Sequence, residues 1–439
     1  MRRSPNLRLA GTSTWFGAAI LWLVCGHASA AGQARPPAAQ TKTQPPAAQS
    51  QAPPPAAHDQ ESAEPSRSAT VPFILDHNRM IVEVEFLRPD GTIRKARAWV
   101  DTGNQYLMMA EPLARDLGLD VSGLKSGERS VELTSTTPLM RLGGLPLHAE
   151  GVKMRALPGA RTMPGEPAEA SLPATVLRHD HVVFDYPARL LTIARPGVLE
   201  PKGVAIPCRV NNETGLFLIA ATVDGDTVQL GVDNGSAGMW VSDSLTTRWT
   251  TRHPDWPRAA GAAGSANFFG FPFESAGVLM CLPDVEIGNL RAEGIGLLGL
   301  DQSVFDWYST KSAGPVLGFI GANVLRSFRV EIDLPNQMTY WEAGPSNEPR
   351  DLDIVGLTLR PEADGSFTVA SVVTKDGKPA VEGVQTGDKL IRVDELDTAN
   401  ATMGAVADAL RGTPGSTHTL VIERAGERIT LEAKVLRLP

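Results

Sequence analysis

Two aspartates stand in matching surroundings in this sequence and could act together. Asp101 ends the apolar run in AWVDTGN, Asp233 ends the one in LGVDNGS, and each is followed two positions later by glycine. A carboxylate at the end of a buried strand is costly unless its surroundings compensate. Two such carboxyls lying side by side cannot both ionise easily, so they share one proton. Such a pair can hydrolyse an amide, because one carboxyl activates a water and the other protonates the carbonyl oxygen.

The elements around the two aspartates recur in the same order, which indicates an internal duplication. Each Asp-x-Gly strand is followed by a glycine-bearing hairpin, at Met140–Met154 and at Val285–Leu298. Each copy then closes with a strand pair, His181–Ile193 and Arg329–Trp341. The aspartates are 132 residues apart, so each copy is large enough to form a lobe. We therefore predict two lobes that face their aspartates across a pseudo-two-fold axis.

Short strands joined by turns are expected to position both aspartates. The segments Ile81–Phe86 and Ile93–Val100 are typical of strands, and Pro89-Asp90-Gly91 between them is typical of a turn. Sustained helical periodicity is scarce, although a short helix is expected at Glu111–Leu117. The fold class that we predict is mainly β, with two barrel-like lobes. The predicted boundaries are 71–200 for the first lobe and 201–345 for the second.

With these motifs the chain resembles the retropepsin-like and pepsin-like aspartic proteases, and in particular the bacterial branch in which two lobes are fused. The stretch GFIGANVLRSFRVEIDLPNQMTYW resembles the second half of such a lobe, and its Phe319-Ile320-Gly321 matches the strand that supports the catalytic turn. The resemblance covers about 270 of the 439 residues. It implies acid-protease-like β-barrels, and an endopeptidase that needs neither metal nor cofactor. The residues that it implies are Asp101 and Asp233 as the catalytic pair, supported by Thr102, Gly103, Asn234, Gly235 and Ser236.

Several positions depart from that family pattern and keep a second interpretation open. Asn234 stands where the family usually has Thr or Ser, whose hydroxyl links the two lobes. Asn104 replaces a small residue, and Ser171–Val176 stands where an apolar-apolar-glycine strand is expected in the first lobe. The alternative is therefore a catalytically inactive relative that binds peptides or serves as a scaffold.

A flap over the substrate is another feature of the family. Leu133–Leu145 in the first lobe and the glycine-rich, aromatic Gly261–Phe273 in the second are both candidates. The alternative for each is an ordinary surface loop.

The C-terminal residues 351–439 resemble a PDZ domain. The carrying motif is the run Ala-x-x-Gly-Val-x-x-Gly-Asp-x-Leu at Ala380–Leu390, followed by an expected helix at Met403–Leu410. The resemblance implies a small α/β module that adds a peptide strand to its sheet edge and holds the peptide's C-terminal carboxylate. It can equally be a module that only packs on the lobes. The loop that would hold the carboxylate is Gly356, Leu357, Thr358 and Leu359.

The N-terminal residues carry an export pattern. Arginines precede the apolar run Trp15–Val24, and Ala28-Ser29-Ala30 offers a signal-peptidase site. We predict a signal peptide at 1–30, followed by a Pro/Ala-rich disordered linker at 31–70. The expected location is periplasmic or secreted, with no membrane span after cleavage. An uncleaved signal would instead tether the protein.

Composition and the remaining polar residues exclude some classes of function. The net charge of −8 provides no basic surface for nucleic acid, so protein or peptide substrates are the expected partners. Export permits a disulfide between Cys208 and Cys281, and two separate thiols are the alternative. His179-Asp180-His181 could suggest a metal site, but nothing else in the sequence completes a ligand set. We predict no metal.

Overall fold

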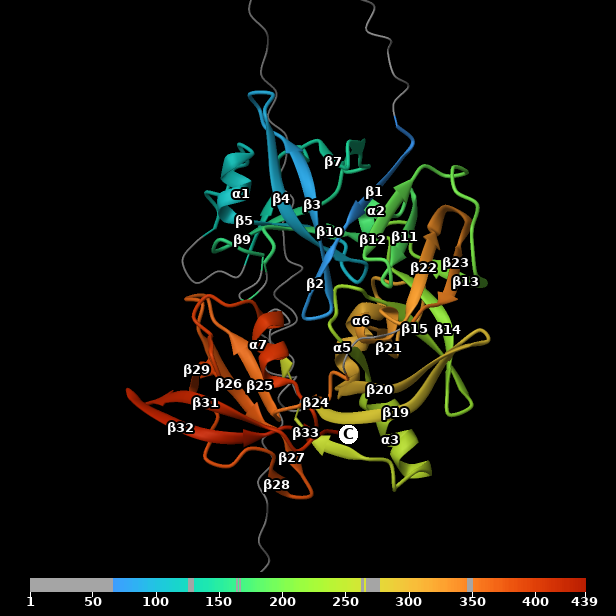
Figure 1. Cartoon of the computed structure of the whole chain (residues 1–439). Coiled ribbons are helices and arrows are strands. Elements are labelled where there is room, and N and C mark those ends of the chain that lie inside the picture. Colours follow the sequence, from blue (N-terminus) through green and yellow to red (C-terminus); the bar gives the residue numbers. More distant parts are fainter. Residues whose placement is uncertain are drawn as a thin grey trace, which may run out of the picture. The chain divides into compact units, whose positions relative to one another are not determined.

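The computed structural model describes residues 66–124, 130–162, 165, 167–261, 264–265, 277–345 and 350–439. The expected signal peptide and most of the expected linker lie outside these residues. We call 66–200 the N-terminal segment, 201–345 the middle segment and 350–439 the C-terminal segment. The fold is mainly β, as predicted: a closed six-stranded barrel, a curled half-barrel sheet and smaller antiparallel sheets (Figure 1).

The N-terminal segment forms the nine-stranded, curled half-barrel sheet. Its strands are β2 (Ile74–Asp76), β3 (Arg79–Leu87), β4 (Ile93–Asp101), β5 (Leu107–Ala110), β6 (Val131–Leu133), β7 (Met140–Leu142), β8 (Leu145–Pro146), β9 (Met154–Leu157) and β10 (Ala170–Pro173). Its helices are α1 (Glu111–Asp116) and α2 (Ala174–Leu177).

The turn between β3 and β4 forms where the sequence predicted it. Gly91 has a φ of +82°, which glycine adopts without strain, and Asp90 Oδ1 accepts a hydrogen bond from the Thr92 N–H at 2.9 Å. Apolar residues of β3 and β4 point into one core because side chains alternate along a strand. The hairpin therefore fixes the register that carries Asp101 to the end of β4.

The middle segment forms the six-stranded closed barrel. Its sheet runs β14-β15-β21-β16-β20-β19, and β19 pairs back with β14 to close it. The strands are β14 (Phe217–Val223), β15 (Asp226–Val232), β16 (Met239–Ser242), β19 (Val278–Ile287), β20 (Leu290–Leu300) and β21 (Gly318–Ile320), with β17 (Arg258–Ala260) beside β19. The helices are α3 (Asp243–Arg252), α5 (Gln302–Ser309), α6 (Ala322–Leu325) and the 3₁₀ turn η2 (Leu334–Asn336).

The closing strand pairs of the two segments join into one antiparallel sheet. The hairpin β11 (His181–Asp185) and β12 (Leu190–Ala194) lies beside the hairpin β22 (Phe328–Asp333) and β23 (Met338–Ala343), because β11 pairs with β22 (Figure 1). The sheet is completed by β1 (Ser68–Pro72) on β12 and β13 (Val204–Val210) on β23. The strand β1 begins at Ser68, inside the segment 31–70 that the composition predicts to be a linker.

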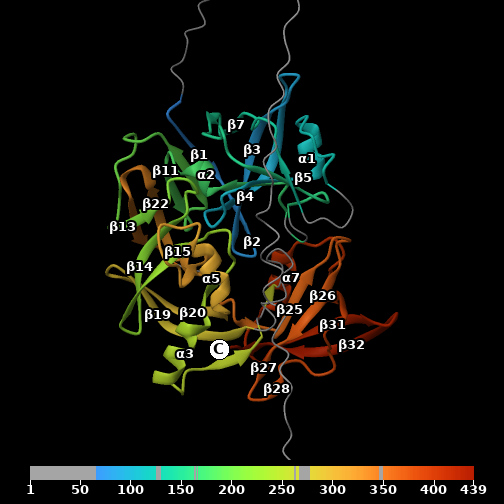
Figure 2. The same ribbon diagram turned by 180° about the vertical axis from the view of Figure 1, so that it is seen from behind.

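The C-terminal segment packs a core of buried apolar residues that also includes Ala259 and Leu279 of the middle segment. Its helix α7 (Met403–Leu410) lies beside a sheet whose path is β18-β25-β26-β29-β31-β32 (Figure 2). The strands of the segment are β24 (Asp353–Ile354), β25 (Leu357–Pro361), β26 (Phe367–Val372), β27 (Thr374–Lys375), β28 (Lys378–Pro379), β29 (Lys389–Val393), β30 (Leu396–Asp397), β31 (Thr417–Arg424), β32 (Glu427–Lys434) and β33 (Leu436–Arg437). The edge strand β18 (Gly264–Ser265) belongs to the middle segment.

The expected disulfide is absent, because Cys208 and Cys281 are both free thiols. Cys208 lies on β13 and Cys281 on β19, and β14 pairs with both strands and so lies between them. Burial and the nearby Asp333 raise the pKa of the Cys208 thiol to about 12, so this sulfur stays protonated and unreactive.

Candidate active site

Asp101 and Asp233 occupy equivalent places at the ends of two strands. Asp101 is the last residue of β4, and β10 runs parallel to it with Pro173 opposite Asp101. Asp233 follows β15, which is parallel to β21, and the Asp233 N–H donates to the Ile320 carbonyl at 3.0 Å. Both side chains are almost fully buried, with exposed fractions of 3% and 1%.

The two carboxyls face each other closely. A Cβ placed on Gly103 would lie 2.3 Å from Asp233 Cγ, and a Cβ placed on Gly235 would lie 2.4 Å from Asp101 Oδ1. Each carboxyl therefore rests against the glycine of the opposite turn, and any side chain at either glycine would displace it. This is the close approach that the two Asp-x-Gly motifs predicted.

The turns are tied to each other by hydrogen bonds across the two segments. Thr102 Oγ1 donates to the Val232 carbonyl at 2.8 Å and accepts from the Asn234 N–H at 3.1 Å. Asn234 Oδ1 in turn accepts from the Thr102 N–H at 2.9 Å. The amide of Asn234 thus bonds to the opposite turn where a hydroxyl was expected, so this departure leaves the link between the turns in place.

Backbone N–H groups of each turn hold its own carboxyl. The Gly103 N–H donates to Asp101 Oδ1 at 3.1 Å. Asp233 Oδ1 accepts from the N–H groups of Gly235 at 2.9 Å and Ser236 at 3.2 Å. Ser236 turns its hydroxyl away, toward the Gly238 carbonyl at 2.7 Å. The carboxyls are therefore oriented by the backbone before any ligand binds.

The strands beneath the turns differ in sequence and match in structure. In the middle segment Gly321 follows β21, and a Cβ there would lie 2.1 Å from the Gly238 carbonyl oxygen, so the close packing requires glycine. The Ala322 N–H then donates to the Ser236 carbonyl at 2.8 Å. In the N-terminal segment the Ala174 N–H donates to the Asn104 carbonyl at 2.9 Å, the equivalent position. Ser171–Val176 thus provides the supporting strand without the expected glycine.

Burial gives both aspartates a raised pKa. For Asp101 the pKa is well above the usual value because of burial and the neighbouring Asp233 carboxyl. For Asp233 burial raises the pKa to about 6, opposed by the N–H of Gly235 and the positive charge of Arg79. Because the two carboxyls interact strongly, their protons belong to the pair as a unit. A pair that holds one proton over the weakly acid range can act as acid and base together.

Sequence reasoning missed three residues that surround the pair. Arg79 has an exposed fraction of 1% and donates from Nε to the Gly235 carbonyl at 2.6 Å. Tyr308 on α5 has a raised pKa because of burial and, after that, the negative charges of Asp233 and Asp101. Tyr186 lies beside the Asn234 side chain. Arg79 begins β3, Tyr308 lies on α5 and Tyr186 lies in the turn between β11 and β12, and no local signal in the sequence marks any of them.

The two flap candidates have different positions. Within Leu133–Leu145, β7 pairs with β3 and forms a hairpin with β8, so this stretch is an edge of the half-barrel sheet. Most of Gly261–Phe273 lies outside the described residues. Its strand β18 runs parallel to β25, with Gly264 opposite Thr358 and Ser265 opposite Leu359.

That pairing involves the expected carboxylate-binding loop of the C-terminal segment. Gly356, Leu357, Thr358 and Leu359 are all buried. The Leu357 N–H donates to the Val355 carbonyl at 2.7 Å, and β18 covers the edge of β25 and contacts α7. The structure therefore brings the predicted loop to a sheet edge, and another part of the same chain already pairs with that edge.

One residue of the histidine cluster, His181, contacts Glu331 within the sheet that joins the two segments. His181 Nε2 lies 2.6 Å from Glu331 Oε2, and both side chains are buried between β11 and β22. Arg195 Nη1 donates a hydrogen bond to Asp180 Oδ1 at 2.8 Å. No group of three or more histidine, cysteine or acidic side chains suited to a metal occurs among the described residues.

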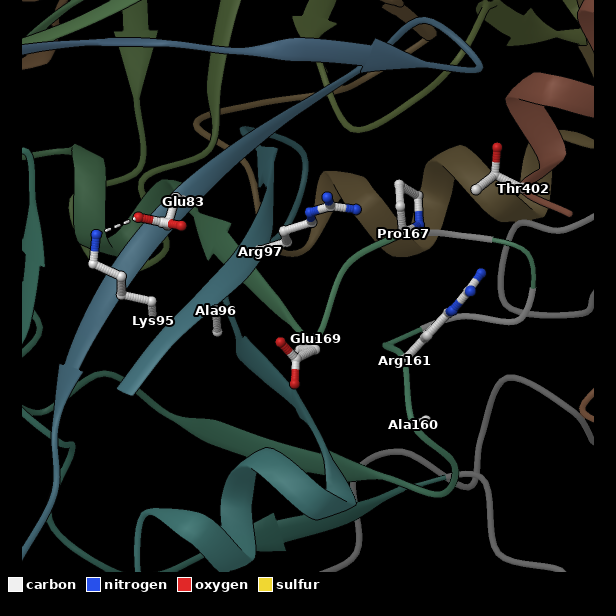
Figure 3. A pocket seen from close by; sticks show the side chains of 9 residues that line it. All are labelled: Glu83, Lys95, Ala96, Arg97, Ala160, Arg161, Pro167, Glu169 and Thr402. Atoms are coloured by element: carbon white, nitrogen blue, oxygen red, sulfur yellow. Dashed lines mark hydrogen bonds and ion pairs between the residues drawn. The ribbon is translucent and has the colours of Figure 1, made fainter. Parts of the chain in front are cut away.

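A separate open hollow of about 470 Å³ is lined by residues of the N-terminal segment and by Thr402 of the C-terminal segment. Figure 3 shows charged side chains around it, among them Arg97, Arg161 and Glu169, with Lys95 paired to Glu83 at 2.8 Å. Neither aspartate turn lines this hollow, so it is distinct from the paired carboxyls.

Comparisons with family models and with curated proteins gave no match, so only the residues of the site indicate a function. No protein-family model matches the sequence, and a search of curated proteins found no significant match. In the part of the chain that the structure describes, no helix combines the length and apolar character that crossing a membrane requires.

Proposed function

We propose that this chain is an exported aspartic-type endopeptidase, related to the two-lobed retropepsin-like and pepsin-like enzymes. The observation that carries the proposal is the contact between Asp101 and Asp233. Each carboxyl lies against the glycine of the other turn, and Thr102 and Asn234 tie the turns together. Two buried carboxyls that share one proton are suited to activating water.

The proposed reaction uses both protonation states of the pair. The ionised carboxyl takes a proton from a water while the water oxygen attacks the peptide carbonyl carbon, and the protonated carboxyl gives its proton to the carbonyl oxygen. The C–N bond of the resulting tetrahedral diol then breaks. The carboxyl that took the proton from water gives a proton to the nitrogen, and the other carboxylate takes a proton from a diol hydroxyl, which leaves the acid and the amine and restores the pair. The pair needs no covalent intermediate, and the N–H groups of the turns hold both carboxyls in place.

The C-terminal segment is proposed to be a PDZ-like module that selects a substrate or partner by strand addition. In support, a sheet edge at β25 already accepts a strand, and the helix α7 lies beside it. A peptide with a free C-terminal carboxylate would have to replace β18 at this edge.

A catalytically inactive peptide-binding protein is the second candidate. The exposed fractions of Asp101 and Asp233, 3% and 1%, favour it, since a substrate has little access to either carboxyl in this conformation.

The test is cleavage of an unbiased peptide library between pH 3 and 7 by the wild type, Asp101→Asn and Asp233→Asn. Asparagine keeps the oxygen that accepts the N–H groups of each turn, so both variants should fold. We expect cleavage by the wild type and a loss of at least about a thousand-fold in each variant, about 4 kcal/mol of barrier. Cleavage that survives in either variant would remove the pair from the mechanism. A folded wild type that cleaves nothing would favour the scaffold.

A further inference from the structure

Arg79 is a buried charge in direct contact with the paired turns. It begins β3, and its Nε donates to the Gly235 carbonyl at 2.6 Å. Its guanidinium lies over the Trp99 ring, 5.9 Å from the ring centroid. A buried guanidinium is costly unless partners of good geometry hold it, and the Gly235 carbonyl is one such partner.

The contact between Arg79 and Gly235 involves both aspartate turns. Gly235 belongs to the turn of Asp233, and its backbone packs against the carboxyl of Asp101. Trp99 fills the space on the same side, because a Cβ on Gly235 would lie 2.8 Å from its ring. A residue of the N-terminal segment thus donates to the carbonyl of the glycine that packs against the Asp101 carboxyl.

The position of the middle segment that is equivalent to Arg79 carries no charge. In the half-barrel Ile81 pairs with Trp99, two positions before Asp101, and in the barrel Leu218 pairs with Gly231, two positions before Asp233. The counterpart of Arg79 is therefore Leu216, which is buried and apolar. The two halves of the site match in their turns and differ at this position.

Hydrogen bonds hold the hairpin of β2 and β3, which carries Arg79, to the middle segment and to the C-terminal segment. The Asn78 side chain donates to the Ala237 carbonyl at 3.0 Å and accepts from Arg326 at 2.8 Å. Asp76 Oδ1 accepts from the Gly404 N–H at 3.0 Å, at the start of α7. These contacts leave the Arg79 side chain little freedom to withdraw from the turn.

We propose that Arg79 is a positioning residue for the aspartate pair, which fixes the second turn against the first carboxyl and supplies a permanent positive charge beside both. This charge favours the ionised form and lowers the pKa of both aspartates, against the larger effect of burial. Asp76 and His77 on the same hairpin also interact with Arg79, and His77 additionally with Arg411. Their titration is therefore followed together with that of the pair.

The test measures the carboxyls directly. The side-chain ¹³C resonances of labelled aspartate are followed against pH in the full chain, for the wild type, Arg79→Gln and Arg79→Lys. Glutamine keeps a donor and loses the charge, so we expect the first ionisation of the pair to move upward by at least about half a pH unit. Lysine keeps the charge but not the planar donor, so a smaller upward shift is expected. Leu216→Met is the matched control and should leave the titration unchanged.

The inference rests on the proposed peptidase only for a second readout, the acid limb of the kcat/KM profile, which should move with the carboxyl titration. A shifted titration without cleavage by any form would support Arg79 and remove the peptidase. An unshifted titration in a folded Arg79→Gln or, if that variant does not fold, in Arg79→Lys would overturn the inference. A lower stability with unshifted carboxyls would likewise assign Arg79 a purely structural role.

Discussion

Replacing both aspartates by asparagine should stabilise the protein at neutral pH and much less at acid pH. Burial raises the pKa of Asp233 from 3.8 to about 6 and that of Asp101 well above its usual value. A carboxyl whose folded pKa exceeds its unfolded pKa contributes its full stability below the unfolded pKa, and this contribution is lost as the pH rises through the folded pKa. The wild type should therefore lose stability from about pH 4 upward, relative to a variant without these carboxyls.

The size of the effect follows from the same values. A rise of the Asp233 pKa from 3.8 to about 6 corresponds to about 3 kcal/mol. Asp101 acts in the same direction and adds to the relative loss between pH 3.5 and pH 7. Asparagine can still accept the N–H groups that now bond Asp233 Oδ1, so the turn itself should survive the substitution.

The assay is urea unfolding followed by tryptophan fluorescence, at several pH values from 3.5 to 7.5. The free energy of unfolding is compared between the wild type and the double variant Asp101→Asn/Asp233→Asn. Asp120→Asn serves as the control, because Asp120 is exposed and its hydrogen bonds from Ser122 lower its pKa, which gives a pH dependence of the opposite sign. Parallel curves for the wild type and the double variant would refute the claim that two buried carboxyls share this site.

Two further predictions concern single glycines. Gly103→Ala should abolish cleavage and destabilise the protein by roughly 2 kcal/mol or more, because the new methyl would lie 2.3 Å from Asp233 Cγ. Gly238→Ala, whose methyl would meet nothing nearer than 4.0 Å, is the control, and equal denaturant midpoints for the two would contradict the packing. Gly264→Pro should weaken the strand opposite Thr358 and increase the binding of labelled peptides that end in a free carboxylate several-fold, measured by fluorescence anisotropy. Unchanged binding, or equal binding of amidated peptides, would show that β18 does not compete with such ligands.

Local elements were predictable wherever a short pattern decides the structure. The helix expected at Met403–Leu410 is α7, and the helix expected at Glu111–Leu117 is α1, one residue shorter at its end. The helices α3 and α5 were not predicted, although Ser242 and Asp301 accept hydrogen bonds at their starts as N-cap residues do. These two helices are short and amphipathic, and in a strand-rich chain their apolar residues could not be told apart from those of strands of similar length.

The sequence by itself determined the position of both aspartate turns, the order of the elements around them and the mainly β class. These features depend on short motifs and on alternation along a strand, which a single segment carries. Only the tertiary structure decided that each carboxyl lies on the opposite glycine, that Asn234 bonds to the other turn, and that β18 pairs with β25. It also separated the two cysteines and brought Arg79 to Gly235. Such contacts join residues more than sixty positions apart, and their geometry depends on the register of whole sheets, which no local pattern encodes.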